Sequence, residues 1–164
     1  AVVPAMQINL SENALCGIDR YGDGTYTADG IKAIAESISV SPSMTSINLS
    51  SNNIAGVTET GYVKASKVQG SSFNVGDKVV YEGKEMVVSK AKDNDGDIKM
   101  STIPDLAGIK SIADAIRVSP SVTSVDLSWN ELGAEGAELL APAIRDSPSV
   151  TSVRAFVNSW SSGG

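Results

Sequence analysis

Residues that can carry chemistry are few in this chain, and the most conspicuous ones lie in an acidic loop. Asp19-Arg-Tyr-Gly-Asp-Gly24 has carboxylates at positions 1 and 5 and a glycine at position 6, the spacing of a calcium-binding loop. Calcium needs six or more oxygen ligands, and Tyr21 at position 3 and Gly30 at position 12 supply no carboxylate. The alternative is a structural loop in which Thr27 or Asp29 caps the next helix.

A second acidic loop, Asp93-Asn-Asp-Gly-Asp97, could gather a hard cation through its carboxylates. An Asp-Gly pair between two strand patterns is also a strong hairpin signal, so a tight turn competes with cation binding as the explanation. Neither loop has the complete ligand set of a metal site. We therefore expect no metal and no cofactor.

The nucleophiles of the chain lack activating partners. The sequence contains no histidine, which excludes imidazole metal ligands and every Ser-His or Cys-His catalytic pair. The one cysteine, Cys16, excludes a disulfide within the chain and a multi-cysteine zinc site, and we expect it to be a small buried filler. Gly133-Ala-Glu-Gly136 lacks the Lys-Ser/Thr that completes a phosphate-binding loop. The sequence thus predicts a protein that is not an enzyme.

A pattern of the form apolar-x-x-apolar-x-apolar-x-x-Asn occurs four times and decides the fold class. The copies begin at residues 5, 44, 122 and 150 and end at Asn13, Asn52, Asn130 and Asn158. The last two copies begin 28 residues apart (122 to 150), whereas the second and third begin 78 apart (44 to 122), which leaves room for an insertion. Within a copy, alternation points Ile47 and Leu49 inward and Asn48 outward, as in a strand.

A helical pattern lies between the strand copies. It occurs at residues 30–43, 108–121 and 136–149, and each copy ends in Ser-Pro-Ser. In the first copy Ile31, Ile34 and Ile38 fall on one helical face. Each helix should end before its Ser-Pro, because the residue that precedes a proline is disfavoured in the α region.

These strand–loop–helix units resemble leucine-rich repeats. The 28-residue spacing and the segment Leu132–Ile144 resemble the ribonuclease-inhibitor-like subclass, although Ile and Val often replace Leu and the last copy is degenerate. The resemblance implies an α/β solenoid of about four repeats with a parallel sheet, formed by residues 1–56 and 106–164. Because an asparagine side chain both donates and accepts, we expect the asparagine that ends each copy to be buried and bonded to free backbone groups.

Residues 57–105 form the insertion, and their composition differs from that of the repeats. Seven of the nine lysines lie there, and helical periodicity disappears. Strand patterns at 78–81, 85–89 and 97–100, separated by turn signals, predict a small antiparallel meander, to which 62–68 could add a fourth strand. The pattern Val-Gly-Asp-Lys-Val-x-Tyr-x-Gly-Lys resembles a small SH3-like barrel, so that a closed barrel and a plain hairpin sheet both remain open.

Composition narrows the partners and the environment. The net charge of −6 disfavours nucleic-acid binding, which depends on cationic neutralisation of phosphates. No run approaches 18 apolar residues, so we expect no membrane insertion. Residues 1–4 are too short to be a signal peptide, and a single cysteine is compatible with a reducing compartment, but the compartment itself stays open.

The remaining candidate site is the exposed face of the predicted sheet. It should be polar and nearly uncharged, with Asn48, Asp126 and Arg154 among its side chains. Trp129 is the exception: it is either a binding anchor or a side chain packed on the neighbouring repeat's loop. We expect a non-catalytic module that binds or scaffolds another protein. The alternative is a structural subunit of a larger assembly, held through the inserted β unit or through self-association of ends that carry no obvious polar cap.

Overall fold

The chain folds into two compact units. In the computed structural model, which describes residues 4–19 and 21–155, one unit comprises Ala1–Ala55 and Asp105–Gly164 and the other comprises Gly56–Pro104. We call the first the array unit and the second the insert unit, and each is described by itself.

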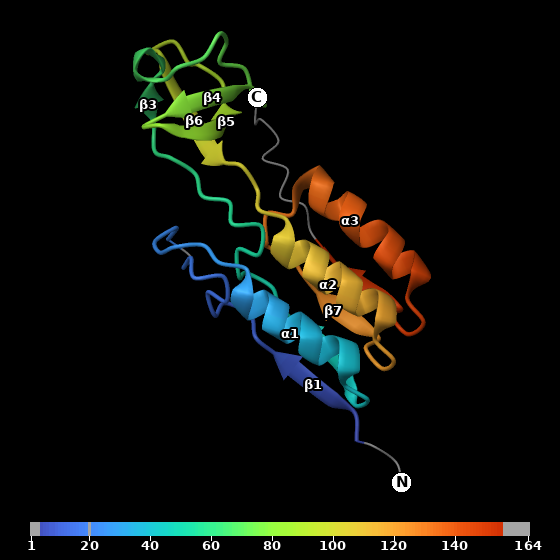
Figure 1. Cartoon of the computed structure of the whole chain (residues 1–164). Coiled ribbons are helices and arrows are strands. Elements are labelled where there is room, and N and C mark those ends of the chain that lie inside the picture. The colour runs from blue at the N-terminus through green and yellow to red at the C-terminus, as the bar shows by residue number, and fades with distance from the viewer. Residues whose placement is uncertain (1–3, 20, 156–164) are drawn as a thin grey trace. The chain divides into compact units, whose positions relative to one another are not determined.

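The array unit contains a parallel sheet covered by helices on one face. Its strands are β1 (Met6–Asn9), β2 (Met44–Asn48), β7 (Ser124–Asp126) and β8 (Ser152–Arg154), in the spatial order β1-β2-β7-β8. Its helices are α1 (Asp29–Val40), α2 (Ala107–Val118) and α3 (Gly133–Asp146), which lie side by side (Figure 1). Mixed α/β structure with a parallel sheet is confirmed.

All three helices end where the sequence predicts. Their last residues precede Ser41, Ser119 and Ser147, and each of these serines is extended and is followed by a proline. The start of α1 differs from the expectation. Its N-cap is Ala28, without a side-chain cap bond, and Thr27 only accepts a hydrogen bond from the Asp29 N–H at 3.3 Å.

The core of the array unit lies between the sheet and the helices. The inward positions of β2 are buried as alternation predicts, with Ile47 1% and Leu49 0% exposed. The helices contribute one apolar face each, so that neighbouring repeats share one cluster of aliphatic side chains. Its fully buried large members include Ile31, Ile38, Ile54, Ile109, Ile112, Ile116, Leu127 and Leu132.

The insert unit is a four-stranded antiparallel sheet with its own core. The strands β3 (Val63–Lys64), β4 (Lys78–Tyr81), β5 (Lys84–Lys90) and β6 (Asp97–Thr102) lie in the order β3-β6-β5-β4. Sequence reasoning identified β4, β5 and β6, but the fourth strand is only two residues long because the short 3-10 helix Ala65–Lys67 follows it. The core consists of Ala65, Val68, Val79, Met86, Val88, Ile98 and Met100.

Replacing Gly56–Pro104 with a short loop based on Leu132–Gly136 should leave the array unit folded. The Asp105 N–H donates to the Ala55 carbonyl at 2.9 Å, so the two residues of the array unit that flank the insert are already in contact. The entropic cost of closing a loop depends only weakly on its length, and shortening the connection should therefore change the free energy of unfolding little. The shortened chain should keep a cooperative thermal melt monitored by helical circular dichroism, and a broad, non-cooperative melt would contradict this expectation.

Candidate functional site

Asn52 joins two neighbouring repeats through backbone hydrogen bonds. Its side chain is 1% exposed, and its Oδ1 accepts the N–H groups of Asn13 at 3.0 Å and Leu15 at 3.3 Å. Its Nδ2 donates to the carbonyls of Leu10 at 2.8 Å and Leu49 at 3.0 Å. One amide group thus satisfies backbone donors and acceptors of the preceding repeat that would otherwise be left without partners.

Asn130 repeats the same arrangement one repeat later. It is 0% exposed, its Oδ1 accepts from the Asn52 N–H at 2.9 Å and the Ile54 N–H at 3.3 Å, and its Nδ2 donates to the carbonyls of Leu49 at 2.9 Å and Leu127 at 3.0 Å. Asn130 therefore holds the turn that contains Asn52. The two side chains form a ladder that runs from each repeat back to the one before it.

The expectation that Asn13 is buried is wrong. Asn13 is exposed, and its Nδ2 donates to the Ser11 carbonyl of its own repeat at 2.8 Å. The physical reason is position: β1 is the first strand of the sheet, so the residues described before it supply no repeat for Asn13 to bridge. Asn158, the fourth predicted member, lies outside the described residues.

A second ladder, which sequence reasoning missed, joins the opposite ends of the strands. The Ser121 hydroxyl lies 2.7 Å from the Ser41 carbonyl and 2.8 Å from the Met44 carbonyl. Ser149 makes the equivalent bonds to the Ser119 carbonyl at 2.7 Å and the Val122 carbonyl at 2.8 Å. The available signal is the identical Ser-Pro-Ser at 41–43, 119–121 and 147–149, whose second serine supplies the hydroxyl in the last two copies.

A polar row crosses the open face of the sheet. The strand register places Asn9 beside Asn48, Asn48 beside Asp126, and Asp126 beside Arg154. The Arg154 guanidinium lies 3.6 Å from Asp126 Oδ2, and its side chain is 66% exposed. The structure thus brings three of the four predicted contact residues into one row.

The same polar residues also shape the end of each strand. Asn48 Oδ1 accepts the Ser50 N–H at 2.9 Å, and Asp126 Oδ1 accepts the Ser128 N–H at 3.0 Å and the Ser128 hydroxyl at 2.6 Å. Ser128, which alternation points outward, is in fact only 5% exposed, because it turns back to close this bond. Oδ1 of Asn48 and of Asp126 is therefore engaged in the turn, and Asp126 Oδ2 faces Arg154.

Trp129 follows this turn and is presented to solvent. Its side chain is 59% exposed, and its backbone has φ 60°, in the left-handed region that bulky residues rarely adopt. The equivalent residues Glu12 and Ser51 have φ 58° and 57°, so the repeat itself imposes this conformation. Both interpretations open from the sequence remain, because the loop of the following repeat lies outside the described residues.

In both acidic loops the first aspartate accepts hydrogen bonds from backbone N–H groups of the same loop. Asp19 Oδ1 accepts the N–H groups of Tyr21 at 2.8 Å and Asp23 at 3.0 Å. Asp93 Oδ1 does the same for Asp95 at 3.0 Å and Asp97 at 2.8 Å. Within residues 4–19 and 21–155, no group of three or more His, Cys, Asp or Glu side chains is arranged to hold a metal ion.

Cys16 lies in the core of the array unit. It is 0% exposed, as the sequence predicts. Its burial and, to a smaller extent, the nearby charge of Asp105 raise the pKa of its thiol to about 11. A buried, protonated thiol is a poor nucleophile, because the thiolate is the reactive form.

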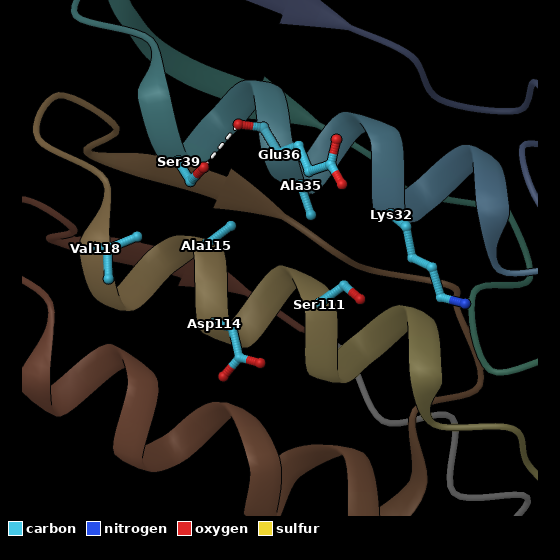
Figure 2. Close-up of a pocket in the computed structure, with 8 residues that line it drawn as sticks. All are labelled: Lys32, Ala35, Glu36, Ser39, Ser111, Asp114, Ala115 and Val118. Atoms are coloured by element: carbon cyan, nitrogen blue, oxygen red, sulfur yellow. Dashed lines mark hydrogen bonds between the residues drawn. The ribbon is translucent and has the colours of Figure 1, made fainter.

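A shallow groove of about 490 Å³ runs between α1 and α2, and sequence reasoning did not identify it (Figure 2). Small side chains such as Ala35, Ser111 and Ala115 leave room there. Two of its three charged residues are engaged within their own helices: the Lys32 ammonium lies 3.8 Å from Asp29, and the Asp114 carboxylate lies 2.7 Å from the Lys110 ammonium. Only the Glu36 carboxylate forms no ion pair among the described residues. The groove therefore lacks convergent polar groups that would orient a ligand.

Comparison with known proteins agrees with the repeat structure. Residues 40–57 and 118–141 match the family model described as Leucine Rich repeat, and these matches support a leucine-rich repeat protein. Such repeats generally mediate protein–protein interaction, and the family is typically non-catalytic. No curated protein and no solved structure matches the chain significantly. None of the described helices has both the length and the apolar character needed to cross a bilayer.

Substituting Asn130→Ala should lower the free energy of unfolding by about 1–3 kcal/mol, because it leaves buried backbone groups of two repeats without partners. Asn13→Ala is the matched control: the same change at an exposed ladder position should stay within about 0.5 kcal/mol of the parent chain. Urea denaturation measures both values. Equal effects of the two substitutions would show that the bonds between repeats do not carry the stability.

Proposed function

We propose that the chain is a non-catalytic protein-interaction module: a leucine-rich repeat solenoid of the ribonuclease-inhibitor-like subclass with an SH3-like insertion. The proposal rests on the repeat matches and on the character of the sheet face. Its side chains are polar or small, and its charged pair, Asp126 and Arg154, is mutually engaged at 3.6 Å. Such a surface suits complementary contacts with another protein.

The single observation that carries the proposal is the exposure of Trp129. A tryptophan with 59% of its surface in solvent and a left-handed backbone is energetically unfavourable. The repeat does not require it, because Glu12 and Ser51 occupy the equivalent positions with the same backbone conformation. Tryptophan is among the residues that most often dominate binding energy at interfaces. We therefore assign Trp129 as the anchor of the interface.

The polar row beside the anchor provides the specificity of the interface in this proposal. Arg154 is the most adaptable member, because its guanidinium has several N–H donors besides the one that makes the long contact with Asp126. Asn48 retains its Nδ2 donors while its Oδ1 closes the turn. A partner would thus meet donors at Asn48 and Arg154 around an aromatic centre.

Trp129→Ser should abolish capture of the partner and leave the fold intact. Serine is compatible with this backbone because Ser51 adopts the same φ, and the free energy of unfolding should stay within about 0.5 kcal/mol of the parent value. The measurement is quantitative affinity capture from source lysate, with the parent chain and the variant compared protein by protein. Val40→Ser removes a similarly exposed apolar side chain, 76% in solvent, from the end of α1 and should change nothing. An unchanged capture profile for Trp129→Ser would refute the anchor.

A second candidate function is that of a structural subunit, and the exposed edge of β1 favours it. Met6 is 40% exposed, and among the described residues no repeat precedes that of Asn13. An edge strand with apolar side chains invites pairing with another chain. Sedimentation velocity across micromolar concentrations should then show association that weakens when Met6 is replaced by Lys. A concentration-independent monomer would reject this candidate and leave the interaction module in place.

A further inference from the structure

The insert unit contains a cluster in which two ammonium groups approach one exposed phenol. Tyr62 is 55% exposed, and the Nζ atoms of Lys90 and Lys99 lie 5.0 Å and 5.1 Å from its ring centroid. Lys90 also donates to the Tyr62 hydroxyl oxygen at 2.6 Å, so it lies at the hydroxyl end of the ring rather than stacked on its face.

The two lysines are an unfavourable pair. Lys90 and Lys99 are direct cross-strand partners in the β5–β6 register, beside an irregularity between Val88 and Lys90. Like charges directly opposite each other destabilise a sheet. Glu59 offsets one of them, with its Oε2 3.2 Å from Lys99 Nζ, while its Oε1 accepts the Ser89 hydroxyl at 2.7 Å. Asp93 also lies close enough for its charge to contribute to the raised Lys90 pKa, but no ion pair joins it to Lys90 among the described residues, so the Lys90 ammonium can still donate to a further acceptor.

The hydrogen-bond directions leave donors free in this cluster. An ammonium has no acceptor, so in the Lys90–Tyr62 bond the phenol oxygen must accept, and its own proton points elsewhere. No acceptor for that proton is found among the described residues. Lys90 keeps further N–H donors, and its bond to Tyr62 is the main reason that the Lys90 pKa is raised. Tyr62 and Lys90 thus present several donors together with a positive charge.

We propose that Tyr62, Lys90 and Lys99 form a binding site for a carboxylate side chain in an acidic segment of a partner protein. A carboxylate accepts from Tyr62 and Lys90 at once and screens the repulsion between the two lysines. The charge of the insert argues for a single anionic group rather than a polyanion: its seven lysines are balanced by seven Asp and Glu residues over 56–104. The site does not depend on Trp129 and gives the insert unit a ligand of its own.

The test is an NMR titration of the isotope-labelled full chain with a short, otherwise uncharged peptide that carries one Glu. The amide signals of Tyr62, Lys90 and Lys99 should shift in a saturable manner, and the affinity should fall as salt is added. The same peptide with Gln in place of this Glu should leave the signals unchanged. Lys90→Gln keeps a donor for Tyr62 but removes the charge, and it should weaken binding roughly 1.5- to 5-fold. Lys67→Gln, an exposed lysine elsewhere on the insert, is the matched control and should bind as the parent does.

A second variant keeps the test decisive if Lys90→Gln fails to fold. Tyr62→Phe retains the ring and removes the hydroxyl, and it should weaken binding roughly 2- to 10-fold. Equal binding of the Gln peptide, equal loss with Lys67→Gln, or no saturable shift would overturn the proposal. Inorganic phosphate forms a further arm: if it shifts the same signals as strongly as the peptide at equal concentration, the site takes free oxyanions and the assignment to a protein segment is wrong.

Discussion

The hydrogen bonds of Asn52 and Asn130 are the constraint on which the array unit depends. β1 and β2 each end in a turn with partly or fully buried backbone N–H groups, and Asn52 and Asn130 each satisfy such groups of the preceding repeat. The chain reaches this geometry by placing the residues on both sides of each asparagine in the left-handed region. These residues are Glu12 and Ala14, Ser51 and Asn53, and Trp129 and Glu131. The exposed conformation of Trp129 is thus part of the device that buries Asn130.

Side chains at the strand ends bond to the backbone of the neighbouring repeat. Asn52 and Asn130 act where the chain leaves β2 and β7, and Ser121 and Ser149 act where it enters β7 and β8. Threonines add a third set, with the Thr123 hydroxyl 3.0 Å from the Thr45 carbonyl and the Thr151 hydroxyl 3.2 Å from the Thr123 carbonyl. Because these bonds are local to each pair of repeats, an insertion between Ala55 and Asp105 leaves them undisturbed.

Much of the fold follows from patterns that the sequence repeats. The alternation around Ile47 and Leu49 predicts their burial, and Ser-Pro ends each helix because proline restricts the residue before it. The failures arise where the outcome depends on a neighbour. Asn13 has the same local sequence signal as Asn52 but lacks a described repeat to bridge. Lys90 and Lys99 become opposed only through a register that includes an irregularity, which no pattern in the sequence specifies.

Native-state hydrogen exchange of the Asn52 and Ile54 amides tests the central claim most directly. Both donate to Asn130 Oδ1, at 2.9 Å and 3.3 Å, and neither belongs to a helix or strand. If the ladder holds the array together, these amides should exchange only through global unfolding, as slowly as those in the centre of α2. Exchange of the Asn52 and Ile54 amides at the rate of ordinary surface turns, with α2 still protected, would show that the asparagine ladder does not hold the repeats together.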